Sequence, residues 1–154
     1  MKQYPGKLIS VLYRKSQVYW GHVLKDSDIA TSEYPILIVL FKQDGITQEE
    51  IASNLSIDKS AIARVIKSLL EKGLIERSRD FEDRRCKRIY LTQKGHSSRE
   101  LIEDGIKEWN RIISKDIPLE TVEQVVAVMS QMVENLEHCP MKEEMDEEEK
   151  GQKE

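Results

Sequence analysis

The chain has 154 residues, of which 39% are hydrophobic and 34% are charged, and its formal net charge is −4. No apolar run approaches the roughly 20 residues that a membrane-spanning helix needs, and the opening residues lack the apolar core of a signal peptide. Two cysteines, Cys86 and Cys139, are too few for a disulfide framework. The composition therefore argues against a membrane-spanning or disulfide-stapled protein, and it predicts a cytoplasmic, helix-rich chain.

The charge is distributed unevenly along the chain. Residues 58–99 contain 12 Lys and Arg against 6 Asp and Glu, whereas residues 137–154 contain 3 against 8. A basic centre fits contact with phosphates, because local charge and not the chain average determines that contact. Residues 140–154 have almost no apolar side chains, and we expect them to be disordered. This acidic tail either competes with such phosphates for the basic residues or only keeps the protein soluble.

Two helices are predicted in the first part of the chain. Residues 7–25 form the first, because apolar side chains recur there at three- and four-residue spacing. We expect another helix or another subunit to bury this stripe. Ser32 is predicted to cap the second helix, which tolerates Pro35 in its first turn. Residues 36–41 are apolar nearly all round, which indicates a helix buried on several sides.

Residues 47–72 have the pattern of a helix-turn-helix. Thr47 and Glu50 have the spacing of a capping box, which opens a short third helix. Asp58 is placed to cap the fourth helix by accepting from the amides of its first turn, and Gly73 follows the last turn, where a left-handed residue commonly ends a helix. One face of the fourth helix is apolar, and we expect the other face to meet DNA through Lys59, Ser60, Ala61, Arg64 and Lys67.

A basic hairpin follows the helix-turn-helix. Residues 74–78 and 89–91 are strand-like, and the polar loop between them is rich in arginine. Helix followed by hairpin is the order of a winged helix-turn-helix, which places a helix in the major groove and a wing on the minor groove. We therefore predict DNA contacts for three wing residues, Arg84, Arg85 and Lys87. Arg77 and Arg88 either contact DNA or act as structural partners of Asp83.

Two further amphipathic helices are predicted after the hairpin. Thr92 is placed to cap the first, whose apolar stripe runs from Leu101 to Ile117 until Pro118 ends the helix. The last helix begins at Leu119, and its apolar residues follow a near-heptad seam. Because these two helices and the first helix all have uncovered apolar faces, we expect them to form a bundle between subunits.

The predicted fold is therefore mainly α with a small β-hairpin wing, a winged helix-turn-helix joined to a helical dimerisation domain. Four segments are expected along the chain. They are a dimerisation helix at residues 1–31, the DNA-binding domain at 32–95, dimerisation helices at 96–139 and the disordered acidic tail at 140–154.

Residues 46–95 closely resemble the MarR/SlyA family of bacterial transcription regulators. Three motifs carry the resemblance, and their order and spacing together are specific. They are LEKGLIER at residues 70–77, DRR at residues 83–85 and LTxxG at residues 91–95. The flanking predicted helices agree with that family in number and order, so the resemblance extends from Lys7 to about Cys139.

The resemblance implies an obligate homodimer that binds a pseudo-palindromic operator with one recognition helix per half-site. Many members of the family are repressors released by small aromatic ligands, and some respond to thiol oxidation. In the family pattern, Asp83 braces the wing through basic neighbours and Arg85 enters the minor groove. This chain departs from the pattern at Ala61, where members often carry threonine, and the departure changes which bases are read.

The same resemblance predicts an effector pocket between the dimer helices and the DNA-reading part. Its candidate residues, unless they are plain core, are Tyr13, Trp20, His22 and Tyr34. A metal site is not expected, because the three histidines, His22, His96 and His138, lack the spacing of metal ligands. No cofactor is implied. No catalytic motif such as G-x-S-x-G or a phosphate-binding glycine loop occurs, so an enzyme is not expected.

The sequence thus predicts a sequence-specific DNA-binding transcription regulator, and the resemblance implies that it is a homodimer and a repressor. Two alternatives remain open at this point. A winged-helix module that binds protein partners would bind DNA weakly and would be indifferent to the loss of Arg64. A redox switch would use Cys86, because cationic neighbours favour the reactive thiolate; otherwise Cys86 is an exposed strand residue without a partner.

Overall fold

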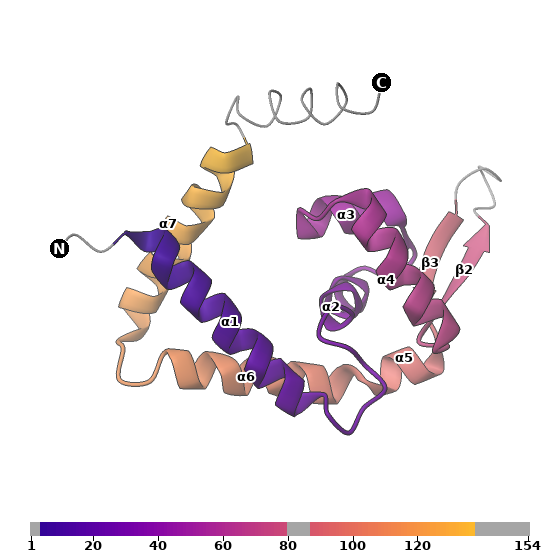
Figure 1. Ribbon diagram of the computed structural model, residues 1–154, viewed down its shortest axis with the longest axis horizontal. Helices are drawn as coiled ribbons and strands as arrows, with labels where there is room; N and C mark the ends of the chain where they lie inside the picture. Colours follow the sequence, from indigo (N-terminus) through magenta and orange to yellow (C-terminus); the bar gives the residue numbers. More distant parts are fainter. Residues whose placement is uncertain (1–3, 80–86, 138–154) are drawn as a thin grey trace. The chain divides into compact units, whose positions relative to one another are not determined.

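The computed structural model describes residues 4–79 and 87–137, apart from the side chain of Arg79. Helices form most of this part of the chain, with one small antiparallel sheet, which confirms the predicted fold class (Figure 1). The elements follow in the order α1 (Pro5–Val23), α2 (Tyr34–Lys42), β1 (Ile46–Thr47), α3 (Gln48–Leu55), α4 (Lys59–Glu71), β2 (Ile75–Arg79), β3 (Lys87–Leu91), α5 (Gln93–Ser97), α6 (Arg99–Ile113) and α7 (Leu119–Glu137). The chain divides into two compact units, residues 1–110 and residues 111–154.

The predicted helix-turn-helix consists of α3 and α4, and both helices begin at the predicted caps. The Thr47 hydroxyl accepts from the Glu50 N–H at 3.2 Å, and the Glu50 carboxylate accepts from the Thr47 N–H at 2.7 Å. The Asp58 carboxylate accepts from the N–H groups of Ser60 (2.8 Å) and Ala61 (3.2 Å). Each cap satisfies N–H groups that have no partner inside the helix, so the starts of both helices are determined locally.

Left-handed residues follow both helices. Ser56 has a φ of 50° after α3, and Gly73 has a φ of 68° after α4. Gly73 lies where the sequence predicted it, and glycine adopts this backbone conformation without steric cost.

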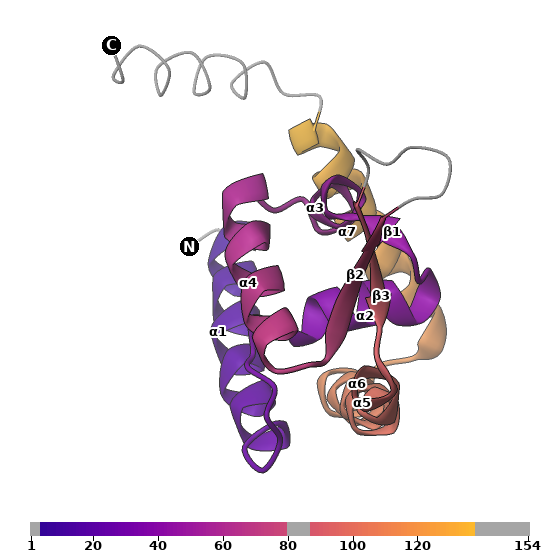
Figure 2. The same ribbon diagram turned by 90° about the vertical axis from the view of Figure 1, so that its right-hand side faces the viewer.

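The sheet contains the predicted hairpin and one strand more. β2 and β3 form the hairpin, and β1 pairs with the other side of β3, so that the strand order is β1-β3-β2 (Figure 2). Ile46 of β1 pairs with Ile89 of β3. Gly45 precedes β1 with a φ of 73°, and a ring carbon of Tyr90 lies 2.6 Å from the position of an added Cβ. Glycine is therefore required where the chain enters the sheet.

A hydrophobic core joins α2, α3, α4, α6 and the sheet. Its largest fully buried apolar side chains are Ile36, Leu37, Leu40, Ile51, Ile62, Ile66, Leu69, Leu74, Ile89 and Ile102. The predicted apolar stripe of α4 supplies three of them, so this helix turns its other face outward. Trp20 of α1 is also buried, and its ring lies 2.9 Å from the position of an added Cβ at Gly105 of α6. The absence of a side chain at Gly105 lets α1 and α6 approach closely.

The start of α2 differs from the prediction. Ser32 is exposed and does not cap the helix, and Glu33 stands at the cap position. The Glu33 carboxylate is buried and accepts from the N–H of Ala30 at 2.7 Å. Glu33 therefore stands where the sequence predicted Ser32, and its other hydrogen-bond partners, Ser68 and Lys72, are distant in the sequence.

The helix predicted after the hairpin is divided and shorter than expected. Thr92 caps α5 as predicted, because its hydroxyl accepts from the N–H of Gly95 at 3.1 Å. Ser98 then separates α5 from α6, and α6 ends at Ile113. Asp116 follows with a left-handed φ of 62°, so the chain leaves the helix before Pro118 can end it.

In residues 111–154, α7 has no buried residue. Its exposed apolar side chains include Val125, Val126, Val128, Met129, Val133 and Leu136. The predicted near-heptad seam is therefore uncovered in the single chain. In residues 1–110, the apolar side chains of Leu8, Ile9 and Leu12 in α1 are also exposed. Neither α7 nor any other described helix is long and apolar enough to cross a membrane.

Candidate nucleic-acid interface

The outward face of α4 carries the residues that the sequence assigned to DNA contact. Lys59, Ser60, Arg64 and Lys67 are exposed, and Ala61 is half-buried. The opposite face of α4 lies in the core, so its packing fixes the direction in which the polar face points. This geometry is what insertion of a helix into a major groove requires, since the inserted face must be free of protein contacts.

Both exposed lysines of this face already form ion pairs with carboxylates. Lys59 Nζ lies 2.9 Å from Glu49 Oε1 of α3, and Lys67 Nζ lies 3.9 Å from Glu71 Oε1. Both pairs are well exposed, where an ion pair contributes little net free energy. A phosphate can therefore replace either carboxylate at small cost. Arg64 forms no ion pair with any residue that the structure describes.

Asp58 caps the first turn of α4. The Ser60 hydroxyl donates to the Asp58 carboxylate, which also accepts from two backbone N–H groups. The Ser60 hydroxyl, followed by the N–H groups of Ser60 and Ala61, holds the pKa of Asp58 below its ordinary value. The Ser60 hydroxyl can therefore donate to a DNA phosphate only if it turns away from the cap.

The wing is described only at its base. Lys87 is exposed in β3, and Arg88 is half-buried with its Nη1 donating to the carbonyl oxygen of Gly45 at 2.9 Å. Arg77 of β2 donates from Nη2 to Gln48 Oε1 of α3 at 3.3 Å. Both arginines therefore tie the hairpin to the start of the helix-turn-helix. The sequence did not indicate these partners. The partner of Arg88 is a backbone carbonyl oxygen, and the partner of Arg77 is a glutamine for which no role was predicted.

Several predicted residues lie outside the described residues. They are Asp83, Arg84, Arg85 and Cys86 in the wing, His138 and Cys139, and the acidic tail at 140–154. Their predicted roles stay predictions. Among the residues that are described, no three His, Cys, Asp or Glu side chains lie close enough together to hold a metal ion.

An aromatic cluster brings together two of the four predicted pocket residues. Trp20 stacks on Tyr34 with ring centroids 4.0 Å apart and an angle of 21° between the planes. Burial, followed by the nearby Tyr13, raises the pKa of Tyr34. Tyr13 itself is 64% exposed, and His22 is exposed too.

The cluster also contains two residues that the sequence had assigned only to apolar stripes. Tyr19 lies with its ring centroid 5.6 Å from Trp20 and 5.1 Å from Trp109. The Tyr19 hydroxyl donates to the carbonyl oxygen of Gly105 at 2.8 Å. Helical spacing places both residues on the apolar stripes of their helices, but it does not indicate which aromatic rings meet.

The fold and the exposed face of α4 together define a winged helix-turn-helix transcriptional regulator, and the comparisons agree. Residues 29–87 match the model of the MarR family. An uncharacterized HTH-type transcriptional regulator of Staphylococcus aureus (strain Mu50) is 30% identical over 132 residues, covering 84% of this chain and 83% of the relative. A MarR transcriptional regulator from Methanosarcina mazei Go1, known from its crystal structure, is 34% identical with a TM-score of 0.78, covering 87% of this chain and 96% of that one. The chain belongs to the MarR family.

Two solved structures of lower identity share the fold. A mutant MarR from E. coli, complexed with operator DNA, is 23% identical with a TM-score of 0.74, covering 82% of this chain and 91% of that one. BpsR of Bordetella bronchiseptica, whose DNA binding is regulated by 6-hydroxynicotinic acid, is 19% identical with a TM-score of 0.75, covering 85% and 99%. At these identities the likeness concerns the fold alone.

Proposed function

We propose that this regulator binds a pseudo-palindromic DNA operator as a homodimer and represses transcription there. In each subunit α4 reads bases in the major groove of one half-site, and the wing follows the adjacent minor groove. The observation that carries the proposal is the exposed polar face of α4 opposite a fully buried stripe. The E. coli MarR complex with operator DNA supports it, because that protein has the same fold.

The residues of the face differ in their proposed roles. Arg64, which forms no ion pair with a described residue, contacts base edges. Lys59 and Lys67 exchange their exposed carboxylate partners for phosphates, which positions the helix without reading sequence. Ser60 and Ala61 line the start of the helix. In the wing, Arg84, Arg85 and Lys87 contact the minor groove and its phosphates, while Arg77, Asp83 and Arg88 brace the hairpin.

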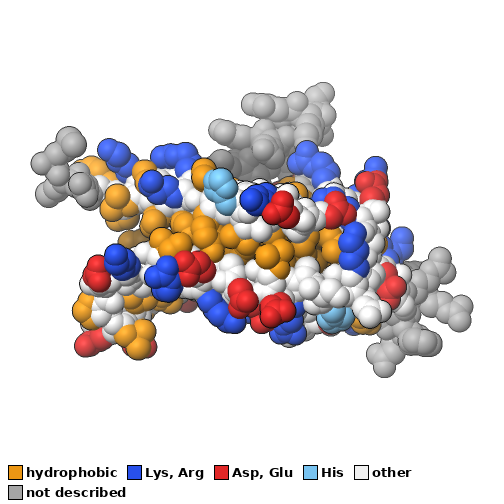
Figure 3. Space-filling view, turned by 90° about the horizontal axis from the view of Figure 1, so that it is seen from below, with side chains coloured by type: hydrophobic (Ala, Val, Ile, Leu, Met, Phe, Trp, Pro, Cys, Tyr) orange, Lys and Arg blue, Asp and Glu red, His pale blue; other side chains and the backbone are white. Residues whose placement is uncertain are grey.

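The dimer is proposed from uncovered apolar surface. α7 exposes a row of valines, methionine and leucine, and α1 exposes Leu8, Ile9 and Leu12. Figure 3 shows hydrophobic side chains gathered in the middle of one face, with charged side chains on both sides. Exposed apolar side chains in such number mark an interaction site, and a second copy is the partner that two reading heads on a pseudo-palindromic operator need. Residues 1–31 and 96–139 are thus assigned to dimerisation and residues 32–95 to DNA binding.

A small aromatic effector is proposed to act at the aromatic cluster. Trp20 of α1, in the proposed dimer helix, stacks on Tyr34 of α2, in the proposed DNA-binding part, and Tyr13 and His22 lie on the same α1 helix. A ligand that separates the stacked rings would change the direction of α1 relative to α2. The two reading heads would then no longer match the operator, which releases the repressor.

The test begins with selection of a binding site from a random double-stranded DNA library. The selected site is then titrated at several salt concentrations with wild type, Arg64→Ala and Arg85→Ala. We expect saturable binding that weakens steeply with salt. Loss of Arg64 is expected to cost about 1–3 kcal/mol and to relax base preference, whereas loss of a phosphate contact lowers the salt slope by about one.

Lys42→Ala is the matched control, because Lys42 is an exposed cation at the end of α2 that belongs neither to the residues assigned to DNA contact nor to the ranges assigned to dimerisation. It removes the same charge without touching the proposed interface, and we expect wild-type binding. Binding no tighter than to random DNA, or binding indifferent to both arginines, would overturn the proposal and favour a winged-helix module that binds protein partners.

A further inference from the structure

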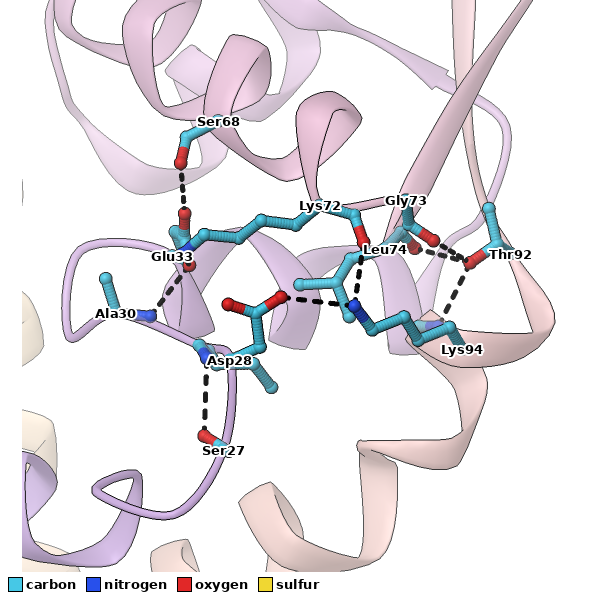
Figure 4. A network of polar contacts seen from close by, with 12 residues as sticks. Ser27, Asp28, Ala30, Glu33, Ser68, Lys72, Gly73, Leu74, Thr92 and Lys94 are labelled. Carbon is cyan, nitrogen blue, oxygen red and sulfur yellow. Dashed lines mark hydrogen bonds and ion pairs between the residues drawn. The ribbon is translucent and has the colours of Figure 1, made fainter.

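Among the residues that the structure describes, Glu33 is the one charged side chain that is buried. Its carboxylate accepts from three donors, which Figure 4 shows converging from two segments of the chain. Oε2 accepts from the Ala30 N–H at 2.7 Å and from Lys72 Nζ at 2.8 Å. Oε1 accepts from the Ser68 hydroxyl at 2.6 Å. A carboxylate with this many donors has one well-defined position.

The donors connect the recognition helix to the loop between α1 and α2. Ala30 lies in that loop, whereas Ser68 lies in the last turns of α4 and Lys72 directly follows the helix. Ser68 and Lys72 are four residues apart and therefore lie on the same face of the helix, one turn apart. Two contacts at different heights on one face restrain both the rotation of α4 about its axis and its tilt.

A second bridge reaches the same end of α4. Lys94 of α5 donates from Nζ to the carbonyl oxygen of Lys72 at 2.8 Å and to Asp28 Oδ2 at 3.2 Å (Figure 4). Asp28 belongs to the loop between α1 and α2, so this lysine joins three segments. The end of the recognition helix is thus fixed by polar contacts to the two connections that lead to α1 and to α6.

Stability alone is a poor account of such a network. Desolvation of a carboxylate and an ammonium group offsets much of their attraction, and apolar side chains of similar volume often stabilise a protein as well. What a buried ion pair adds, and apolar packing lacks, is a directional requirement, because a small displacement leaves a buried charge without its partner.

We infer that Glu33 is a positioning residue for DNA recognition: it fixes the direction of α4 relative to the connection from α1, and so the separation at which two subunits read their half-sites. The inference rests on the proposed function. It predicts that loss of the Glu33 network weakens the preference for one half-site spacing, and that contacts with random-sequence DNA are retained.

The test uses the operator selected by the wild-type protein, together with versions in which the half-sites are one or two base pairs closer or farther apart. Random-sequence DNA of the same length is included. Wild type, Glu33→Gln, Lys72→Met and the double variant are titrated against the whole series at one salt concentration. Glu76→Gln serves as the matched control, because Glu76 is an exposed carboxylate of β2 that lies outside the network and outside the residues assigned to dimerisation or to DNA contact.

For wild type and for the control we expect a sharp affinity maximum at one spacing. For Glu33→Gln we expect a loss of roughly tenfold, about 1.4 kcal/mol, at that spacing, and less than about a twofold change on the other spacings and on random DNA. Lys72→Met should act in the same direction. The double variant should be no worse than the worse single variant, because both changes remove one interaction.

A profile that keeps its shape in Glu33→Gln, whether unchanged or lowered equally at every spacing, would show a merely structural role and overturn the inference. If the wild-type protein shows no saturable binding to the selected operator, the proposed function and this inference fail together. Failure of the inference alone is therefore distinguishable from failure of the proposed function. Ser68→Ala gives a second readout if Glu33→Gln folds poorly, since it removes one contact with α4 and leaves the ion pair. Its spacing profile should flatten by a smaller factor, and an unaltered profile would count against the inference.

Discussion

Gly105→Ala tests the close approach of α1 and α6. A Cβ at this position would lie 2.9 Å from two ring carbons of Trp20 and 3.2 Å from Cγ1 of Val23. The Trp20 ring cannot move aside easily, because it is 3% exposed and stacked on Tyr34. Overpacking of this kind costs about 1–3 kcal/mol, whereas alanine is better than glycine in a helix interior by about 1 kcal/mol. We expect the free energy of unfolding to fall by roughly 0–2 kcal/mol.

Gly21→Ala of α1 is the matched control, because nothing lies within 4 Å of a Cβ added there. This variant keeps the helix-propensity gain and lacks the clash. Both variants are unfolded in urea at one fixed protein concentration, since the stability of the proposed dimer would depend on concentration, and unfolding is followed by circular dichroism. The difference between them isolates the contact with Trp20, and we expect about 1–3 kcal/mol. A Gly105 variant as stable as the Gly21 variant would refute the reasoning.

Three further predictions concern the caps and the turns. Thr47→Ala should lower the free energy of unfolding by about 1 kcal/mol, because the capping box of α3 is lost; an unchanged urea midpoint would contradict this. The pKa of Asp58 is lowered in the folded state, so its contribution to stability is present above the ordinary value of 3.8 and is lost as pH falls through the lowered pKa. The stability difference between wild type and Asp58→Asn, measured from neutral pH downward, should therefore change only in acid. Gly45→Ala should destabilise more than Gly73→Ala, since both force a left-handed alanine at about 1–2 kcal/mol but only the first meets a ring, that of Tyr90; equal losses in urea unfolding would disprove the contact.

The parts of the fold that were predictable are those that neighbours within about four residues determine. Thr47, Asp58 and Thr92 cap helices whose first-turn N–H groups are their partners, and Gly73 supplies the left-handed residue after α4. The polar face of α4 could be predicted equally well, because its direction follows from the spacing of the buried apolar residues on the opposite face. In each case the sequence contains both members of the interaction in one window.

The parts that were not predictable depend on distant partners. β1 is two residues long, and only its pairing of Ile46 with Ile89 makes it a strand. Glu33 displaces Ser32 as the residue at the start of α2, and its partners on α4 lie 35 and 39 positions further along the chain. The contact of Arg88 with the Gly45 backbone is of the same kind. No periodicity or motif could indicate these pairs.

The aromatic cluster gives the protein a built-in spectroscopic reporter. The chain has two tryptophans, Trp20 and Trp109. Their ring centroids lie 5.6 Å and 5.1 Å, respectively, from the ring centroid of Tyr19. All indole emission of the chain therefore originates where α1 meets α6, with Tyr34 stacked on one of the two fluorophores. A rearrangement of that junction, on binding of DNA or of a small molecule, changes the emission wavelength or the quantum yield of the tryptophan fluorescence. Binding can therefore be followed in real time without an attached dye.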